Sequence, residues 1–170
     1  MMITKKLTKL DAEYYRNIRL EALYNNPDSF CTMYDEEAIA TINNFRDRIS
    51  TIDNNFILGG YKNKDLVGIV AFDRGSRIKD KHKAYIRSMY VRPESRKEGI
   101  GKLLLNDLIR RAKAIQEIEI LLLDVVTNNL PAKQLYLSFG FQTYGIEEMA
   151  YKLNHQYFDL ELMSLQIKSK

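Results

Sequence analysis

One six-residue stretch limits what this chain can fold into more than any other, because it joins a strand-like run at residues 84–91 to a helix-like run at 102–114. Glycine has no Cβ, so the backbone at such a turn can approach a ligand closely. The helix that follows begins with free N–H groups and a positive dipole end, which together favour a phosphate or pyrophosphate. The stretch and the lysine after it therefore predict an anion-binding turn built from Arg96, Lys97, Glu98, Gly99, Ile100, Gly101 and Lys102.

The segment after the turn predicts a strand–helix–strand unit with parallel strands. A stripe of apolar residues at helical spacing runs from Leu104 to Ile115, and residues 119–126 follow as a strand. The run of one isoleucine and three leucines at 120–123 is typical of a strand that is buried on both faces. Asp124 lies in this strand, where a carboxylate needs a partner. Its simplest interpretation is a structural hydrogen-bond acceptor.

The remaining elements complete an α/β (α+β) fold with a mixed central sheet of six to seven strands and flanking helices. Asp11 is expected to cap a helix that runs to about residue 25, and Asp35 is expected to cap the next, whose apolar stripe extends to Ile49. A turn is expected at 53–55 and a further helix at 131–139, closed by Gly140. The other strands are expected at 3–8, 56–61, 66–73, 141–148 and 157–166. No linker or repeat divides the chain, so residues 1–170 are expected to form one domain.

Composition excludes several classes of function. Hydrophobic residues make up 45% of the 170 residues, which is enough for a core, and a net charge of +4 does not predict nucleic-acid binding. The one cysteine, Cys31, excludes an internal disulfide and a cysteine-rich metal site, and no metal is expected. No signal peptide or membrane-length apolar run is present in the sequence, so a cytoplasmic protein without membrane association is expected.

A second set of residues lies one strand–helix unit after the glycine turn, in the order Asn129, Ala132, Leu135, Tyr136, Gly140 and Phe141. Together with Arg-x-x-Gly-x-Gly at 96–101, this set resembles the acyl-CoA N-acyltransferases of the GNAT superfamily over nearly the whole chain. The resemblance implies that the fourth and fifth strands are parallel and splayed. It implies that Met89 and Val91 offer backbone groups to pantetheine and that the amides of 96–102 hold the pyrophosphate. It also implies that Asn129 binds the cofactor and that Tyr136 stands near its sulfur.

The activity implied is transfer of an acetyl group from acetyl-CoA to a primary amine, by direct attack with both substrates bound and without a metal. A non-catalytic acyl-CoA sensor on the same fold is the alternative. A nucleotide-binding module is disfavoured because the full Gly-x-x-x-x-Gly-Lys-Ser/Thr pattern is absent. Some of these residues also have simpler interpretations. Gly99 and Gly101 could form only a tight turn, Tyr136 could only pack, and Asn129 could only cap a helix. The sequence does not identify the amine acceptor. It leaves open whether acyl groups other than acetyl are used and whether the chain forms a homodimer.

The general base is not evident, because residues 86–90 contain no carboxylate. Asp73, Asp159 and Glu161 are the candidates, either for catalysis or for binding a cationic acceptor, and a water-relayed proton is the default. The segment 26–37 is expected to wall the acceptor site. Its acidic residues are Asp28, Asp35, Glu36 and Glu37, and they favour a cationic amine, although the last three equally suit the start of a helix.

Overall fold

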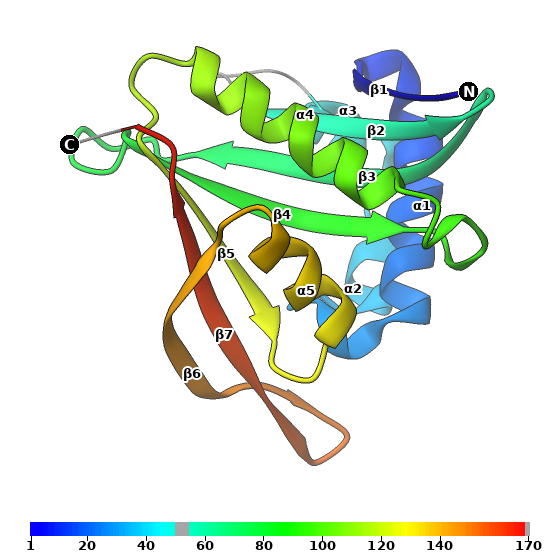
Figure 1. Ribbon diagram of the computed structural model, residues 1–170. Helices are drawn as coiled ribbons and strands as arrows, with labels where there is room; N and C mark the ends of the chain where they lie inside the picture. Colours follow the sequence, from blue (N-terminus) through cyan, green and yellow to red (C-terminus); the bar gives the residue numbers. More distant parts are fainter. Residues whose placement is uncertain (50–54, 169–170) are drawn as a thin grey trace.

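The computed structural model describes residues 1–49 and 55–168, and in them a seven-stranded mixed sheet forms the centre of the molecule (Figure 1). The strand order is β1-β2-β3-β4-β5-β7-β6. The strands are β1 (Met2–Lys6), β2 (Phe56–Lys62), β3 (Asp65–Arg74), β4 (Lys83–Val91), β5 (Ile120–Val126), β6 (Gln142–Leu153) and β7 (Gln156–Gln166). The predicted fold class is confirmed.

The strands β4 and β5 form the parallel pair, and all the other neighbours in the sheet are antiparallel. The parallel pairing covers only Lys83–Tyr85 against Ile120–Leu122. Beyond it the two strands separate like the sides of a V, with α5 drawn between them (Figure 1). The predicted parallel pair and its splay are therefore present.

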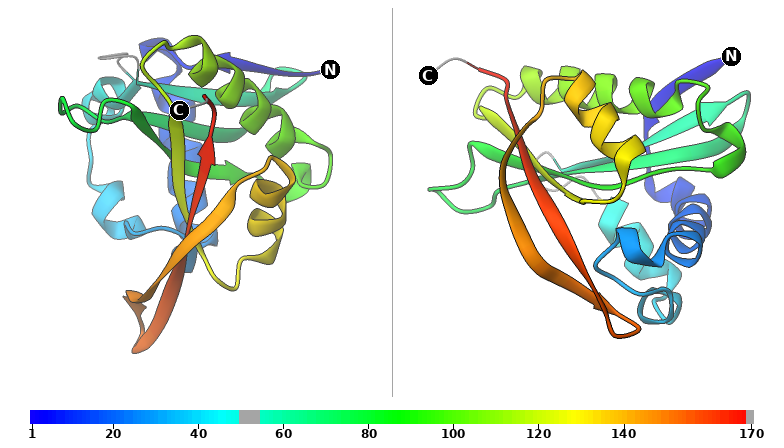
Figure 2. Two further views of the ribbon diagram at one scale, coloured as in Figure 1. Left: turned by 60° about the vertical axis from the view of Figure 1, so that its left-hand side comes forward. Right: turned by 60° about the horizontal axis from the view of Figure 1, so that its bottom comes forward.

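Helices cover both faces of the first half of the sheet (Figure 2). The α-helices are α1 (Ala12–Asn25), α2 (Tyr34–Ala38), α3 (Ile42–Ile49), α4 (Ile100–Ala114) and α5 (Leu130–Ser138), of which α5 lies at the splay. On one face the leucine stripe of α4 packs against the side chains of Leu58 and Phe72. On the other face α1 and α3 pack against Ile57 and Ile69. Adjacent residues of β2 thus point into opposite cores, as the two-residue period of a strand requires.

The helix predicted from Asp35 to Ile49 is wrong, because the structure has two short helices, α2 and α3, separated at 39–41. The first begins after Met33, whose N–H donates to the Glu36 carboxylate at 2.8 Å, so Asp35 is not the cap. At the second start, the N–H and hydroxyl of Thr41 both donate to the Asn44 side chain at 2.8 Å. A threonine that forms such a local cap ends one helix and begins another.

The strand β5 is not buried on both faces: Leu121 and Leu123 are buried, but Leu122 is half-buried and Asp124 is exposed, because the splay opens one face. Asp11 occupies the predicted N-cap position, but its carboxylate accepts from the N–H and hydroxyl of Thr8 rather than from the helix. Residues 53 and 54 of the predicted turn lie outside the described residues. No helix within the described residues is long and apolar enough to cross a membrane.

Candidate active site

The splay leaves one edge of β4 available to a ligand. Pairing with β5 stops at Tyr85, and from residue 86 onward the backbone groups on that edge have no neighbouring strand among the described residues. A bulge lies in the same stretch, since Ile69 pairs with Tyr90 but Ala71 pairs with Arg87. Ser88, in this bulge, has a φ of 54°. Bulges of this kind redirect the strand and are frequent beside active sites.

The glycine turn leads directly into α4, as the sequence predicts. Gly99 occupies the N-cap position with a φ of 97°, a left-handed conformation that disfavours other residues. Gly101 lies against the cleft wall, because a Cβ there would meet Leu135 Cδ2 at 3.3 Å and Met89 Cε at 3.5 Å. The Arg96 guanidinium donates to the Val91 carbonyl at 2.9 Å, which ties the turn to the end of β4. The first N–H groups of α4 therefore belong to a glycine turn that lines the larger cavity.

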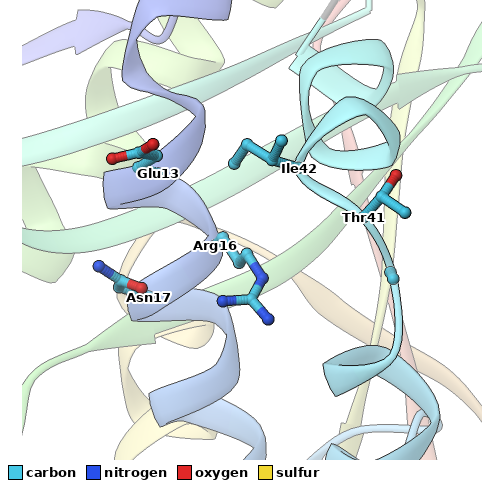
Figure 3. Close-up of a pocket in the computed structure, with 6 residues that line it drawn as sticks. Glu13, Arg16, Asn17, Thr41 and Ile42 are labelled. Carbon is cyan, nitrogen blue, oxygen red and sulfur yellow. The ribbon is translucent and has the colours of Figure 1, made fainter.

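Two neighbouring cavities follow the splay. The larger cavity measures about 710 Å³ and the smaller about 230 Å³. The two share lining residues from the segment after α1, from β4 and from α5, so they form one continuous cleft; these residues are Ser29, Phe30, Met89, Asn129, Ala132 and Leu135. A separate cavity of about 420 Å³ between α1 and α3 contains none of the predicted site residues (Figure 3).

Most of the predicted cofactor residues line the larger cavity, and these are Met89, Val91, Arg96, Lys97, Gly99, Gly101, Lys102 and Asn129. The side chains of the other two point elsewhere. Glu98 forms an ion pair with Lys62 at 2.8 Å, and Ile100 is buried in the core under α4. Only the backbone amides of Glu98 and Ile100 are thus candidates for contact with a ligand.

Asn129 is the N-cap of α5, and Tyr136 lies near the C-terminal end of the same helix. Asn129 caps α5 by accepting the Ala132 N–H at 3.3 Å, and it also lines both cavities. Tyr136 is 5% exposed, packs edge-to-face on Phe141 and lines the smaller cavity. Burial, and secondly the negative charge of Asp124, raise the pKa of the Tyr136 phenol well above its usual value. The hydroxyl is therefore held in its protonated form.

Asp124 is a site residue that the sequence interpretation missed. Among the described residues it is the one carboxylate that lines either cavity, and the Tyr151 hydroxyl donates to it at 3.4 Å. Burial, and secondly Asp124, raise the pKa of Tyr151 as well. The sequence signal was a lone carboxylate inside an apolar strand. The position of Asp124 in the cleft depends on the splay, which exposes that face of β5.

The three carboxylates proposed as general base lie outside the lining of both cavities. Asp73 pairs with Arg87 at 3.4 Å, and burial raises its pKa although Arg87 opposes the shift. Asp159 accepts the Met149 N–H at 2.8 Å and so supports the bulge of β6. Glu161 is buried and pairs with Lys133 at 2.6 Å, and the hydroxyl of Thr143 donates to it. The structure does not bring these carboxylates to the cleft.

The segment 26–37 does wall the cleft, but through residues that are not acidic, chiefly Ser29, Phe30 and Cys31. Two of its carboxylates are engaged locally. Glu36 accepts the Met33 N–H, and Glu37 is buried between Arg19 and Arg48. The acidic character of this segment therefore gives no support for a cationic acceptor. The described part of the chain holds no group of three or more His, Cys, Asp or Glu side chains that could bind a metal.

Comparison with known proteins points to one family. Residues 4–162 match the sequence profile described as acetyltransferase (GNAT) domain. An uncharacterized N-acetyltransferase of Schizosaccharomyces pombe is 40% identical over 58 residues, which cover 34% of this chain and 35% of that protein. The chain spans 35% or less of the length of the curated relatives it matches.

Two solved structures share the fold. A GNAT-family acetyltransferase from Streptococcus pneumoniae superposes with a TM-score of 0.88 at 23% identity, covering 99% of this chain and 100% of that one. The putative acetyltransferase yncA from Salmonella typhimurium, solved with its cofactor acetyl-CoA, gives a TM-score of 0.85 at 19% identity, with 99% and 95% coverage.

Proposed function

The chain belongs to the GNAT acetyltransferase family, and we propose that it transfers an acetyl group from acetyl-CoA to a primary amine of a small molecule or peptide. The observation that carries the proposal is the continuous cleft between β4 and β5. This cleft leads from the glycine turn, past a free strand edge, to the hydroxyl-bearing Tyr136. Its two chemically different ends suit a nucleotide thioester that carries its reactive group away from its phosphates.

The larger cavity suits the cofactor. N–H groups between Arg96 and Lys102 and the positive end of α4 would bind the pyrophosphate, with further charge from Lys97 and Lys102. The free edge of β4 at Met89 and Val91 would hydrogen-bond the amide groups of pantetheine in the manner of an added strand.

The chemistry proposed is direct attack of the amine on the thioester carbon. The carbon–nitrogen bond forms, the carbon–sulfur bond breaks, and CoA leaves as a thiolate. Negative charge develops on the carbonyl oxygen, where a backbone N–H of the β4 bulge near Met89 is the proposed donor. The Tyr136 hydroxyl is the proposed donor to the departing sulfur.

The amine must lose a proton, since an alkyl ammonium has a pKa of about 10.4. We place Asp124 ahead of Asp73, Asp159 and Glu161 as the acceptor of that proton, directly or through a water molecule. Asp124 lines the smaller cavity, whereas the other three are paired elsewhere. The hydroxyl of Tyr151 orients the Asp124 carboxylate.

Thiol release from acetyl-CoA in the presence of a panel of primary amines tests the proposal. Amines should be acetylated, and alcohols of the same carbon skeleton should not. Activity on alcohols alone would exclude N-acetyl transfer. Tight binding of acetyl-CoA without turnover on any acceptor would instead support the non-catalytic acyl-CoA sensor.

A further inference from the structure

Arg19 is a buried cation with an unsatisfied donor at the edge of the smaller cavity. It lies on α1 and is 8% exposed, and its guanidinium stacks 5.1 Å from the centre of the Phe30 ring. Both Arg19 and Phe30 line the smaller cavity. Within the described residues, Nη1 of Arg19 is buried and has no hydrogen-bond partner. Such a group is costly to leave unpaired, so it points to a partner that the protein alone does not provide.

The local charges leave Arg19 only partly compensated. Its Nε lies 3.6 Å from Glu37 Oε1, which is too long for a hydrogen bond. The same Glu37 oxygen also pairs with Arg48 Nη1, and that contact is the closer of the two. Two positive charges therefore share one negative charge in this cluster. The second arginine at the cavity, Arg87, is already paired with Asp73.

Another part of the lining of the smaller cavity carries the opposite charge. Asp124 on β5 supplies a carboxylate there, with the hydroxyls of Tyr151 and Tyr136 beside it. A ligand that enters this cavity thus meets both a guanidinium from α1 and a carboxylate from β5. A simple cationic amine would leave the Arg19 donor unpaired and would place a second positive charge near it.

We infer that the acceptor of the proposed acetyl transfer is a small primary amine that also carries an oxyanion, first of all a carboxylate, and that Arg19 binds this anionic group. The inference rests on the proposed function for the position of the amine, which would lie between Asp124 and the thioester. Charge-assisted hydrogen bonds from a guanidinium to a carboxylate are among the stronger polar contacts in proteins. The smaller cavity measures about 230 Å³, below the ~300–1,000 Å³ typical of sites for drug-sized ligands. A molecule of amino-acid size is therefore the class that fits.

The first test compares acceptors that differ only in the anionic group. The probes are the standard amino acids and their C-terminal amides, used with acetyl-CoA in steady-state assays. We expect kcat/KM for the preferred amino acid to exceed that for its amide by at least roughly tenfold. Conversion to the amide lowers the pKa of the amine and so leaves more of it unprotonated, which favours the amide and opposes the expected result. Equal or better activity with the amides would overturn the inference.

The second test removes the charge. The preference is the ratio of kcat/KM for the amino acid to kcat/KM for its amide. Arg19→Gln should lower this ratio to about threefold or less, mainly by raising KM for the amino acid, while Arg19→Lys should keep part of the preference. The matched control is Arg16→Gln, on the same helix. Arg16 also contacts the α2 segment, through the Ala38 carbonyl, but it lines the separate cavity (Figure 3). Arg16→Gln should keep the wild-type preference. An Arg19→Gln variant that retains the preference would overturn the inference.

A binding measurement without turnover separates this inference from the proposed function. With CoA in place of acetyl-CoA, carboxylate-bearing amines should raise the melting temperature of the wild type, and their amides should not. Stabilisation without any acetylation would leave the role of Arg19 standing and would exclude acetyl transfer to these amines. Acetylation of amines that lack an anionic group, without stabilisation by any amino acid, would overturn the role of Arg19 and leave the proposed acetyl transfer standing. This comparison uses the wild type, so it decides the inference even if Arg19→Gln fails to fold.

Discussion

The phenol of Tyr136 combines a reactive position with an environment that suppresses its ionisation. It lies in the smaller cavity near Asp124, and both burial and that carboxylate raise its pKa. A thiol has a pKa of about 8.5, so full transfer of a proton from such a phenol to a departing thiolate is unfavourable. Tyr136 is therefore better suited to stabilise the developing negative charge on sulfur through a hydrogen bond. The proton released by the amine can then neutralise the thiolate.

Tyr136→Phe tests this assignment at a single atom. The substitution keeps the ring and its edge-to-face contact with Phe141 and removes only the hydroxyl. We expect kcat to fall by roughly 10²-fold, the lower end of the range for removing one hydrogen-bond donor to a developing negative charge, while acetyl-CoA affinity and Tm change little. Tyr144→Phe is the control, because Tyr144 lies on β6 outside the lining of both cavities. Wild-type kcat in Tyr136→Phe would show that the residue only packs.

The pH profile gives the same prediction a second readout. Because the pKa of Tyr136 is raised above its ordinary value of about 10, the hydroxyl stays protonated as the pH rises to that value. The wild-type kcat should therefore show no alkaline decline from Tyr136 below about pH 10. An alkaline limb that is present in the wild type and absent in Tyr136→Phe would contradict the raised pKa.

At the scale of an element, the start of α4 depends on a backbone that only glycine adopts easily. Gly99 has a φ of 97°, and nothing lies within 4 Å of the position that its Cβ would take. A substitution there is strained by the backbone and not by crowding. The strain acts on the turn that is proposed to hold the pyrophosphate, so its effect should appear in cofactor binding.

Gly99→Val should weaken acetyl-CoA binding by more than about tenfold, or about 1.4 kcal/mol, as measured by calorimetry. The matched control is Gly140→Val, because Gly140 has a similar φ of 89° but follows α5 outside the lining of both cavities. Both variants should lose stability through backbone strain, and only Gly99→Val should lose affinity. A folded Gly99→Val protein with unchanged affinity would exclude the turn from the cofactor site.

At the scale of the whole molecule, the part of the sheet from β1 to β4 is joined to the part that contains β5, β6 and β7 by few residue pairs. The parallel contact between β4 and β5 is limited to Lys83–Tyr85 and Ile120–Leu122, and the β6–β7 hairpin extends away from the rest (Figure 2). The core under α4 and α5 spans the junction, with Ile86 on one side and Leu121 on the other. A ligand lying along the splay would contact both parts and should stabilise the fold as a unit.

Acetyl-CoA at 100 times its dissociation constant should therefore stabilise the protein by about 2.7 kcal/mol. For a chain of this size that corresponds to a rise in Tm of about 5–10 °C. ATP at the same concentration should give a much smaller shift, because the complete nucleotide-binding sequence pattern is absent. An equal shift with ATP would favour the nucleotide-binding alternative over a thioester site.

The sequence by itself determined the parts that depend on local backbone and periodicity. The left-handed turn at Gly99 requires glycine, and Asn129 caps α5 within one helical turn. The alternating strands and the leucine stripe of α4 then determined which residues enter the two cores on either side of the sheet, because apolar spacing is read along a single element. Resemblance to a known family supplied the role of Tyr136, which no local pattern reveals.

The tertiary structure alone decided which charged side chains face the cleft. Asp159 and Glu161 have partners on β6 and α5, whereas Asp124, in an apolar run, lies open to the smaller cavity. Arg19 and Glu37 meet across two helices. These placements depend on where β4 and β5 separate and on the register between strands. Both are long-range properties of the packed sheet, so no short stretch of the sequence encodes them.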